Sequence, residues 1–213
     1  MSRSAQVLGL VAAAWLGWLS VPVEAPALAF EPLGAGEVVP AGFVPVHRVL
    51  SDRAAALGPA LIHSSAQAIA EEAGRVGFDP LLVVALIDVE SDFQYGAVSQ
   101  RGARGLMQIR PATLEYLGER FGVADVKARL AEDPTLEIRL GVRYLHVLRQ
   151  RFGNLDDALL AYNLGPAKLR RVRREHGLAQ YQDYLRAVKR DYAQLQREIG
   201  VGGDWTLAAR PPP

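Results

Sequence analysis

The sequence contains no cysteine. This absence excludes disulfide bonds, metal sites built on thiolates and a lipid anchor attached to an N-terminal cysteine. The chain must therefore be held together by its core. With 213 residues, half of them hydrophobic, it is long enough for one globular domain with extensions.

The sequence also has little excess charge, because 24 lysines and arginines oppose 23 aspartates and glutamates, for a formal net charge of +1. The molecule as a whole is therefore not expected to bind a polyanion, and nucleic acid is not an expected partner. Residues 168–190 are an exception, with eight basic residues against Glu175 and Asp183. We expect a solvated face there, and attraction to an acidic cell wall is the alternative.

Paired metal-binding motifs are absent as well. The four histidines are scattered along the chain and lack the spacing of a metal site; they are His47, His63, His146 and His176. The sequence therefore predicts neither a metal nor another cofactor.

Segments with the two-residue period of a half-buried strand are missing, whereas several segments have apolar residues at helical spacing. Helices are predicted at about residues 60–73, 80–91, 111–120, 134–151, 157–163, 167–176 and 180–199, with a short turn at 125–130. The predicted fold class is all-α, or mainly helical, with room for a small β-hairpin within residues 92–105.

The longest apolar run near the N-terminus, residues 7–19, is too short to span a bilayer comfortably and follows a short basic start at Arg3. This pattern is typical of a secretory signal, and Ala27 and Ala29 fit a cleavage site before Phe30. We expect a signal peptide over residues 1–29 and a periplasmic protein; an uncleaved, membrane-associated anchor is the alternative. Beyond it we expect an extended Pro- and Gly-rich leader (30–59), one catalytic domain (60–200) and a disordered tail (201–213).

The most informative stretch begins with Asp79 and Pro80, a helix cap followed by proline at the first helical position. Seven apolar residues follow without a polar face: Leu81, Leu82, Val83, Val84, Ala85, Leu86 and Ile87. A helix that is apolar all round belongs in a core, so Glu90 ends a buried rod. The helix C-terminus and apolar surroundings both raise the pKa of a carboxyl, which favours a general acid. The alternative is a surface glutamate at a frayed helix end.

A second carboxylate to face Glu90 is not evident. Asp88 and Asp92 are two residues away on either side, which places them on other faces of a helix. Glu115, the next acidic residue, lies within an exposed helical pattern. A single placed acid is therefore the simpler interpretation, although cleavage of a glycosidic bond commonly uses two.

Three blocks in order carry a resemblance to a known family: Glu90-Ser91, then Gly105-Leu106-Met107-Gln108, then Ala161-Tyr162-Asn163 with Gly165-Pro166. Here the sequence resembles the catalytic (SLT) domain of soluble lytic transglycosylases, in the lysozyme-like superfamily and related to goose-type lysozyme. The likeness covers about residues 60–192. It departs from the family at Gln94-Tyr95, where Asn-Pro is common, at Leu164, where alanine is usual, and at Glu137, where asparagine is usual.

The resemblance implies a role for each matching residue. Glu90 would be the catalytic acid, and Ser91 would help to position its carboxyl and the substrate. Gln108 would hydrogen-bond the sugar beside an apolar wall formed by Met107. Tyr162 and Asn163 would border the cleft. Tyr144 matches a position whose hydroxyl lies near the acid in the family.

The implied function is peptidoglycan lytic transglycosylase: cleavage between N-acetylmuramic acid and N-acetylglucosamine with formation of 1,6-anhydromuramic ends, because the sugar's own 6-hydroxyl attacks. One alternative is a hydrolase of the goose-type lysozyme kind, and another is a non-catalytic glycan-binding or scaffold protein. The expected partners are peptidoglycan strands, with a secretion, flagellar or conjugation machine of the envelope as a candidate. We expect a monomer.

Overall fold

The computed structural model describes residues 39–175, 177–200 and 205–209. Along the chain it contains α-helices and short 3-10 helices: α1 Phe43–Arg53, η2 Ala55–Leu57, α2 Pro59–Val76, α3 Pro80–Ser91, α4 Pro111–Phe121, α5 Val126–Glu132, α6 Leu136–Phe152, α7 Leu155–Leu164, α8 Pro166–Arg174, η3 Leu178–Tyr181, α9 Gln182–Glu198 and η4 Trp205–Ala208. The described residues form isolated β-bridges but no named strand. The predicted mainly helical fold is confirmed.

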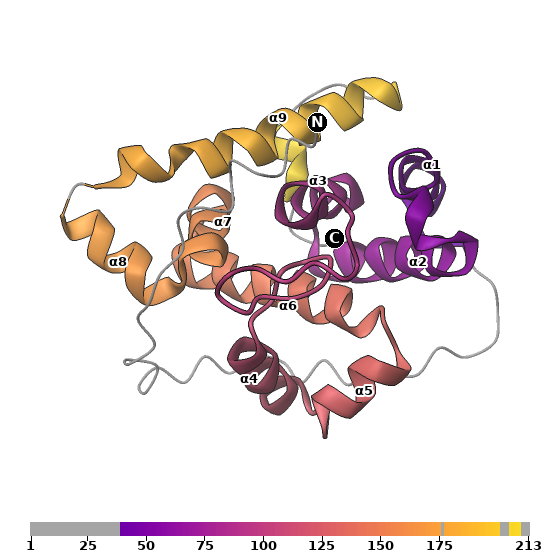
Figure 1. Ribbon diagram of the computed structural model, residues 1–213. Helices are drawn as coiled ribbons and strands as arrows, with labels where there is room; N and C mark the ends of the chain where they lie inside the picture. The colour runs from indigo at the N-terminus through magenta and orange to yellow at the C-terminus, as the bar shows by residue number, and fades with distance from the viewer. Residues whose placement is uncertain (1–38, 176, 201–204, 210–213) are drawn as a thin grey trace.

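Helix α3 is the centre of the core. The Asp79 carboxylate accepts a hydrogen bond from the Leu81 N–H at 2.9 Å and caps the helix as predicted. All residues from Leu81 to Ile87 are at most 2% exposed. Helices α1, α2 and α9 pack around α3 (Figure 1). The prediction that this helix is buried in the core is confirmed. Its packing fixes the position of the residues that follow Ile87.

After α3 the chain enters an irregular segment, residues 92–110, which we name the site loop. Asp92 and Phe93 both have positive φ, 52° and 57°, a conformation that is uncommon for a bulky residue. The Phe93 side chain is only 5% exposed, so core packing holds this turn. Isolated bridges link Arg104 to Val98 and to Ile109. The loop lies between α3 and α6 (Figure 1), and only this small amount of β-pairing is found where a hairpin was considered.

The predicted extended leader is wrong for the described part of residues 30–59. Phe43–Arg53 is a helix, and Val46, Val49 and Leu50 on one of its faces are at most 4% exposed. Their helical spacing is present in the sequence, but the prolines and glycines around it suggested an extended chain. Helix α1 packs on α2 and α3 and is therefore part of the domain.

The predicted disordered tail is likewise wrong for residues 205–209. Ala208 is fully buried, its carbonyl accepts the Asp79 N–H at 3.0 Å, and the Trp205 ring packs edge-on against Tyr192. The rest of that tail and the predicted signal peptide lie outside the described residues. Within the described ranges, no helix is both long and apolar enough to cross a membrane.

The starts of α6 and α7 differ from the prediction for identifiable reasons. Helix α6 begins at Leu136 rather than at Pro134, because the Asp133 carboxylate accepts hydrogen bonds from the Thr135 N–H and hydroxyl and holds a turn before the helix. Helix α7 is capped by Asn154, whose side chain accepts from the Asp157 N–H at 2.9 Å, and not by Asp156.

The basic segment of residues 168–190 is only partly a solvated face. Lys168 is 8% exposed and lies over the Tyr181 ring at 5.0 Å. Arg173 and Lys189 form ion pairs with Asp157 and Asp156 of α7, at 2.8 and 2.6 Å. These contacts tie α8 and α9 to α7, and α9 in turn packs against α3.

A buried ion pair joins α2 to α6. The Arg143 guanidinium donates to both oxygens of the Glu72 carboxylate, at 2.9 and 2.7 Å, and the two side chains are 2% and 1% exposed. Such a paired geometry satisfies charges that would be costly if either were left alone. The pair fixes α6 against the core on a face of the helix different from the one that meets the site loop.

Candidate active site

Glu90 lies in the last turn of α3, directly before the left-handed turn at Asp92 and Phe93. The residue keeps an intermediate exposure, unlike the buried residues before it. Removal of water from around the carboxyl raises the pKa of Glu90 from 4.5 to about 7. A carboxyl with a pKa near neutrality can both give and take a proton, which suits a general acid.

A tyrosine hydroxyl contacts this carboxyl, and it is not the predicted one. The Tyr184 hydroxyl, from α9, donates to Glu90 Oε1 at 2.6 Å. This bond lowers the pKa of Glu90 and so opposes part of the effect of burial. Tyr144 was expected near the acid, but its ring packs against Tyr162 with a centroid distance of 5.4 Å. Tyr184 belongs to the buried stripe of α9. Because a buried tyrosine hydroxyl usually has a hydrogen-bond partner, a tyrosine within an apolar stripe is the feature of the sequence that could have indicated this contact.

The site loop is tied to itself and to α7. The Gln108 amide nitrogen donates to the carbonyls of Ala97 and Gly105, at 3.1 and 2.8 Å. The Tyr162 hydroxyl donates to the Met107 carbonyl at 2.9 Å. Burial and the negative charges of Glu90 and Glu137 raise the pKa of Tyr162 well above its usual value, so this hydroxyl keeps its proton. Two of the three sequence blocks therefore meet through a hydrogen bond.

A second buried carboxyl that sequence reasoning did not assign to the site lies against this loop. Glu137, in the first turn of α6, is 6% exposed and accepts the N–H groups of Leu106 and Met107, at 3.1 and 2.9 Å. Its charge raises the pKa of Glu90. In the sequence, Glu137 was noted only as a departure from the asparagine that is usual at this position. That departure did not indicate a contact with the site loop.

Three predicted substrate contacts are buried. Ser91 is 6% exposed and its hydroxyl donates to the Ile87 carbonyl at 3.1 Å, a bond typical of serine within a helix. Met107 is fully buried and packs against Gly141, where an added Cβ would lie 2.4 Å from its sulfur. Tyr144 is 4% exposed. Their contact with the substrate stays a prediction, and in this structure all three side chains are buried.

The other predicted contacts are partly exposed. Gln108, Tyr162 and Asn163 all have intermediate exposure, as does Glu90. Gln108 has a φ of 49°, in the left-handed region. Residues other than glycine with this backbone conformation are concentrated at active sites and ligand-binding sites. Asn163 lies near the end of α7, one residue after Tyr162.

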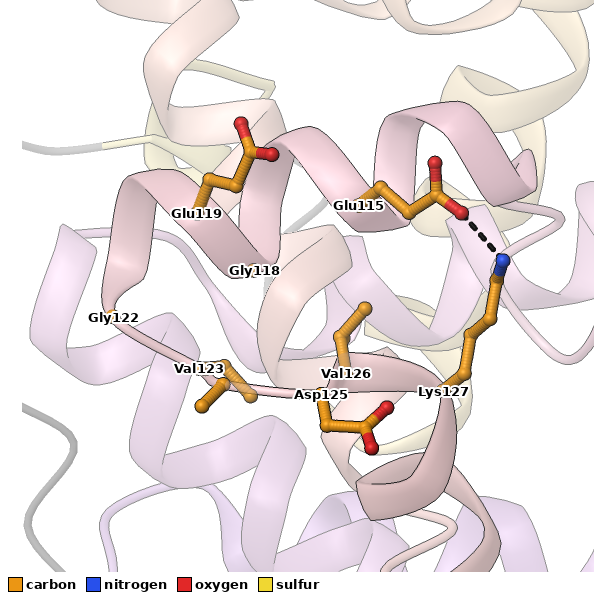
Figure 2. A pocket seen from close by; sticks show the side chains of 9 residues that line it. Glu115, Gly118, Glu119, Gly122, Val123, Asp125, Val126 and Lys127 are labelled. Atoms are coloured by element: carbon orange, nitrogen blue, oxygen red, sulfur yellow. Dashed lines mark ion pairs between the residues drawn. The ribbon is translucent and has the colours of Figure 1, made fainter.

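Two of the three carboxylates considered from the sequence as partners for Glu90 pair with basic residues instead. Asp88 pairs with Arg53 of α1 at 3.1 Å, and Asp92 is exposed after the helix end. Glu115 lies on α4, is 51% exposed and pairs with Lys127 at 2.5 Å. Figure 2 shows that pair at the edge of a pocket between α4 and the start of α5, with a volume of about 520 Å³. The pocket is lined by α4, α5 and their connection and not by the three signature blocks.

Within the described ranges, no three histidine, aspartate, glutamate or cysteine side chains lie close enough together to hold a metal ion.

Comparison with protein families gives a match to the family described as "Transglycosylase SLT domain" over residues 67–185, which is more than half of the chain. This range contains Glu90, the site loop, Glu137 and Tyr184.

Curated relatives show the same likeness. A membrane-bound lytic murein transglycosylase F of Desulfosudis oleivorans is 36% identical over 111 residues, which is 48% of this chain and 22% of the relative. A transglycosylase of Enterobacteria phage PRD1 is 34% identical over 99 residues, 46% of this chain and 34% of the relative. The chain thus spans at most about a third of the length of these two relatives.

Solved structures show a similar fold. An inactive mutant of the lytic transglycosylase Slt from Pseudomonas aeruginosa superposes with a TM-score of 0.58 at 21% identity, covering 79% of this chain and 33% of that one. The 70 kDa soluble lytic transglycosylase of Escherichia coli gives a TM-score of 0.57 at 21% identity, over 78% and 32%.

Proposed function

The chain belongs to the transglycosylase SLT domain family, and from this premise we propose that it is a peptidoglycan lytic transglycosylase with Glu90 as its single acid and base. The observation that carries the proposal is the Glu90 carboxyl, partly exposed at the end of a buried helix, with a pKa raised to about 7 and the Tyr184 hydroxyl at 2.6 Å. Such a group is protonated for a large fraction of the time at neutral pH and can act as an acid there.

In the proposed reaction, Glu90 donates its proton to the glycosidic oxygen as the bond between this oxygen and the muramic acid C1 breaks. The resulting Glu90 carboxylate then accepts the proton of the 6-hydroxyl on the same sugar while that oxygen bonds to C1. Glu90 gives one proton to the leaving oxygen and regains one from the 6-hydroxyl, so it ends the reaction protonated. Because the 6-hydroxyl is the nucleophile, no water is consumed. The 6-hydroxyl is already held beside C1, which gives an intramolecular attack its advantage.

The arrangement of carboxylates supports this reaction over hydrolysis. A hydrolase commonly activates a water with a second carboxylate across the cleft. Both oxygens of Glu137 accept backbone N–H groups, Asp88 is paired with Arg53, and Glu115 is paired with Lys127. Each of these candidates is engaged with another group, so none is placed to hold the attacking water.

The partly exposed residues of the second and third sequence blocks are the proposed contacts to the glycan. They are Gln108, Tyr162 and Asn163, because these predicted residues keep intermediate exposure while Ser91, Met107 and Tyr144 are buried. We assign Ser91, Met107 and Tyr144 to support beneath the loop instead. The proposed catalytic unit includes α1, since this helix packs on α3.

Digestion of purified peptidoglycan tests the proposed function. The purified protein is incubated with intact cell-wall sacculi, and the release of soluble muropeptides is followed by chromatography. We expect release that depends on enzyme concentration and time. Binding to sacculi without any release would contradict catalysis and favour the glycan-binding alternative.

Export is a separate proposal, supported by the apolar run at residues 7–19 and by the envelope substrate. The expected result is a mature chain that begins near Phe30 in the periplasmic fraction. N-terminal sequencing of protein taken from its native host measures this directly. A full-length product in the cytoplasmic fraction would contradict the proposal.

A further inference from the structure

Glu137 is a buried acidic residue for which the reaction described above has no use. Its Oε2 accepts the Leu106 N–H at 3.1 Å and its Oε1 accepts the Met107 N–H at 2.9 Å. Two successive backbone donors of the site loop thus converge on one carboxyl. A carboxylate is the natural acceptor for such a set, because each bond to an ionised group is stronger than a neutral one.

The loop is shaped to admit this carboxyl. Gly105 has a φ of +74°, and a Cβ added there would lie 1.8 Å from Glu137 Oε2. Any side chain at position 105 would therefore collide with the carboxyl, and the backbone conformation also favours glycine. Gly105 and Glu137 fit each other, so the glycine of the signature and the acid of α6 form one unit.

The carboxyls of Glu90 and Glu137 interact. Burial raises the pKa of Glu137 from 4.5 to about 7, and burial likewise raises the pKa of Glu90 to about 7. Negative charge on Glu137 disfavours negative charge on Glu90 and so adds to the raised pKa of Glu90. Other titratable groups that sense Glu137 are Tyr95 of the loop and Tyr162 of α7.

Three other charged groups on or next to α6 already have partners. On its α2 face, Arg143 pairs with Glu72 and Arg139 pairs with Glu71. Asp133, just before α6, accepts hydrogen bonds from Thr135. Glu90 is therefore the acidic group whose titration the charge of Glu137 most directly affects.

The hydrogen bonds decide which carboxyl of the pair gives up its proton first. Glu137 accepts two backbone N–H groups, from Leu106 and Met107, and both bonds favour its ionised form. Glu90 receives one such bond, from the Tyr184 hydroxyl. The larger number of donors to Glu137 favours a single proton on Glu90. Environments that separate two carboxyls in this way commonly set their acid and base roles.

We propose that Glu137 is a positioning residue for the reaction: its carboxylate fixes the Gly105–Ile109 turn beneath the glycan, and its negative charge keeps Glu90 in the protonated, acid form. This inference rests on the proposed function for its role in catalysis, whereas the proton assignment can be tested without any substrate.

The first test compares the pH dependence of kcat/KM in three proteins. Activity needs protonated Glu90, so it falls as pH rises through the pKa of Glu90. Glu137→Gln removes the charge that raises this pKa, and we expect the alkaline limb to move to lower pH by about half a unit, roughly a threefold loss above the limb. KM should also rise, because an amide N–H₂ would face the backbone donors.

Tyr184→Phe is the matched variant. It also removes a hydrogen bond of the site, but this bond lowers the pKa of Glu90, so its loss should move the limb to higher pH. Opposite shifts support the charge assignment, because general damage to the loop has no reason to produce them. A limb in Glu137→Gln that stays in place or moves upward would overturn the role of the charge, and an unchanged KM would overturn the positioning of the turn.

The second test needs neither activity nor a folded Glu137→Gln variant. Carboxyl ¹³C NMR titration of glutamate-labelled protein is recorded for the wild type and for Glu90→Gln. In the wild type we expect the pair to titrate in two steps. In Glu90→Gln, Glu137 should titrate alone at the lower of the two midpoints, because it is the group that ionises first. Titration of Glu137 at the upper midpoint would overturn the inference, whether or not the protein proves to cleave peptidoglycan.

Discussion

Glu90→Gln is expected to lower the rate of peptidoglycan cleavage by roughly 10²–10⁴-fold, the usual contribution of a positioned acid. The change keeps the size of the side chain and an acceptor for the Tyr184 hydroxyl, but removes the proton that the leaving oxygen needs. Since Glu90 is partly exposed at the end of α3, its replacement leaves the buried run from Leu81 to Ile87 intact. The thermal unfolding midpoint should therefore stay close to that of the wild type.

Glu115→Gln is the matched control for this experiment. It is the same chemical change at an exposed carboxylate that pairs with Lys127 beside the α4–α5 pocket (Figure 2). Initial rates of muropeptide release should match the wild type, since an exposed ion pair contributes little to stability. If Glu90→Gln digested sacculi as fast as Glu115→Gln, the assignment of Glu90 as the acid would be lost.

Glu72→Gln is expected to cause the largest loss of stability, roughly 3–5 kcal/mol in the free energy of unfolding. The Arg143 guanidinium is 2% exposed and donates to both oxygens of Glu72. An amide in place of the carboxylate leaves this buried positive charge without its counter-charge. The measurement is urea unfolding followed by circular dichroism, with the midpoint and the slope fitted for each variant.

Glu71→Gln provides the comparison for Glu72→Gln, because the neighbouring pair of Glu71 with Arg139 has side chains that are 13% and 12% exposed. Greater access to water should make its loss smaller. Equal losses for the two variants would contradict the view that burial of the Glu72 pair sets its importance. The variant at Glu72 should retain the pH profile of the wild type wherever it is folded, since this pair lies on the α2 face of α6 and not on the loop face.

Short-range sequence patterns predicted those parts of the fold that depend on interactions between residues close in sequence. The cap at Asp79, the apolar run of α3 and most helix ranges follow from spacing, caps and glycine stops, which act over a few residues. Glu90 could be singled out for the same reason, because its surroundings are largely set by the helix that it ends. Errors came where composition outweighed spacing, as in α1, whose buried face lies between prolines and glycines.

The partners of Glu90 could not be predicted in this way. Tyr184 is 94 positions along the chain from Glu90, and Glu137 is 30 positions from Met107. Such contacts depend on how α6 and α9 pack against α3, which no local period specifies. Sequence alone could not decide which tyrosine reaches the acid, and Tyr144 and Tyr184 are both buried tyrosines on amphipathic helices.

The chemical form of the product tests the central claim most directly. Muropeptides released from sacculi by the wild-type protein are separated and weighed by mass spectrometry. If Glu90 acts alone and the sugar supplies its own nucleophile, the new muramic ends should be 1,6-anhydro ends, each one water lighter than a hydrolytic end and without a reducing group. These products should be lost in Glu90→Gln. A digest made mostly of reducing-end muropeptides would mean that water attacks, and would contradict the account.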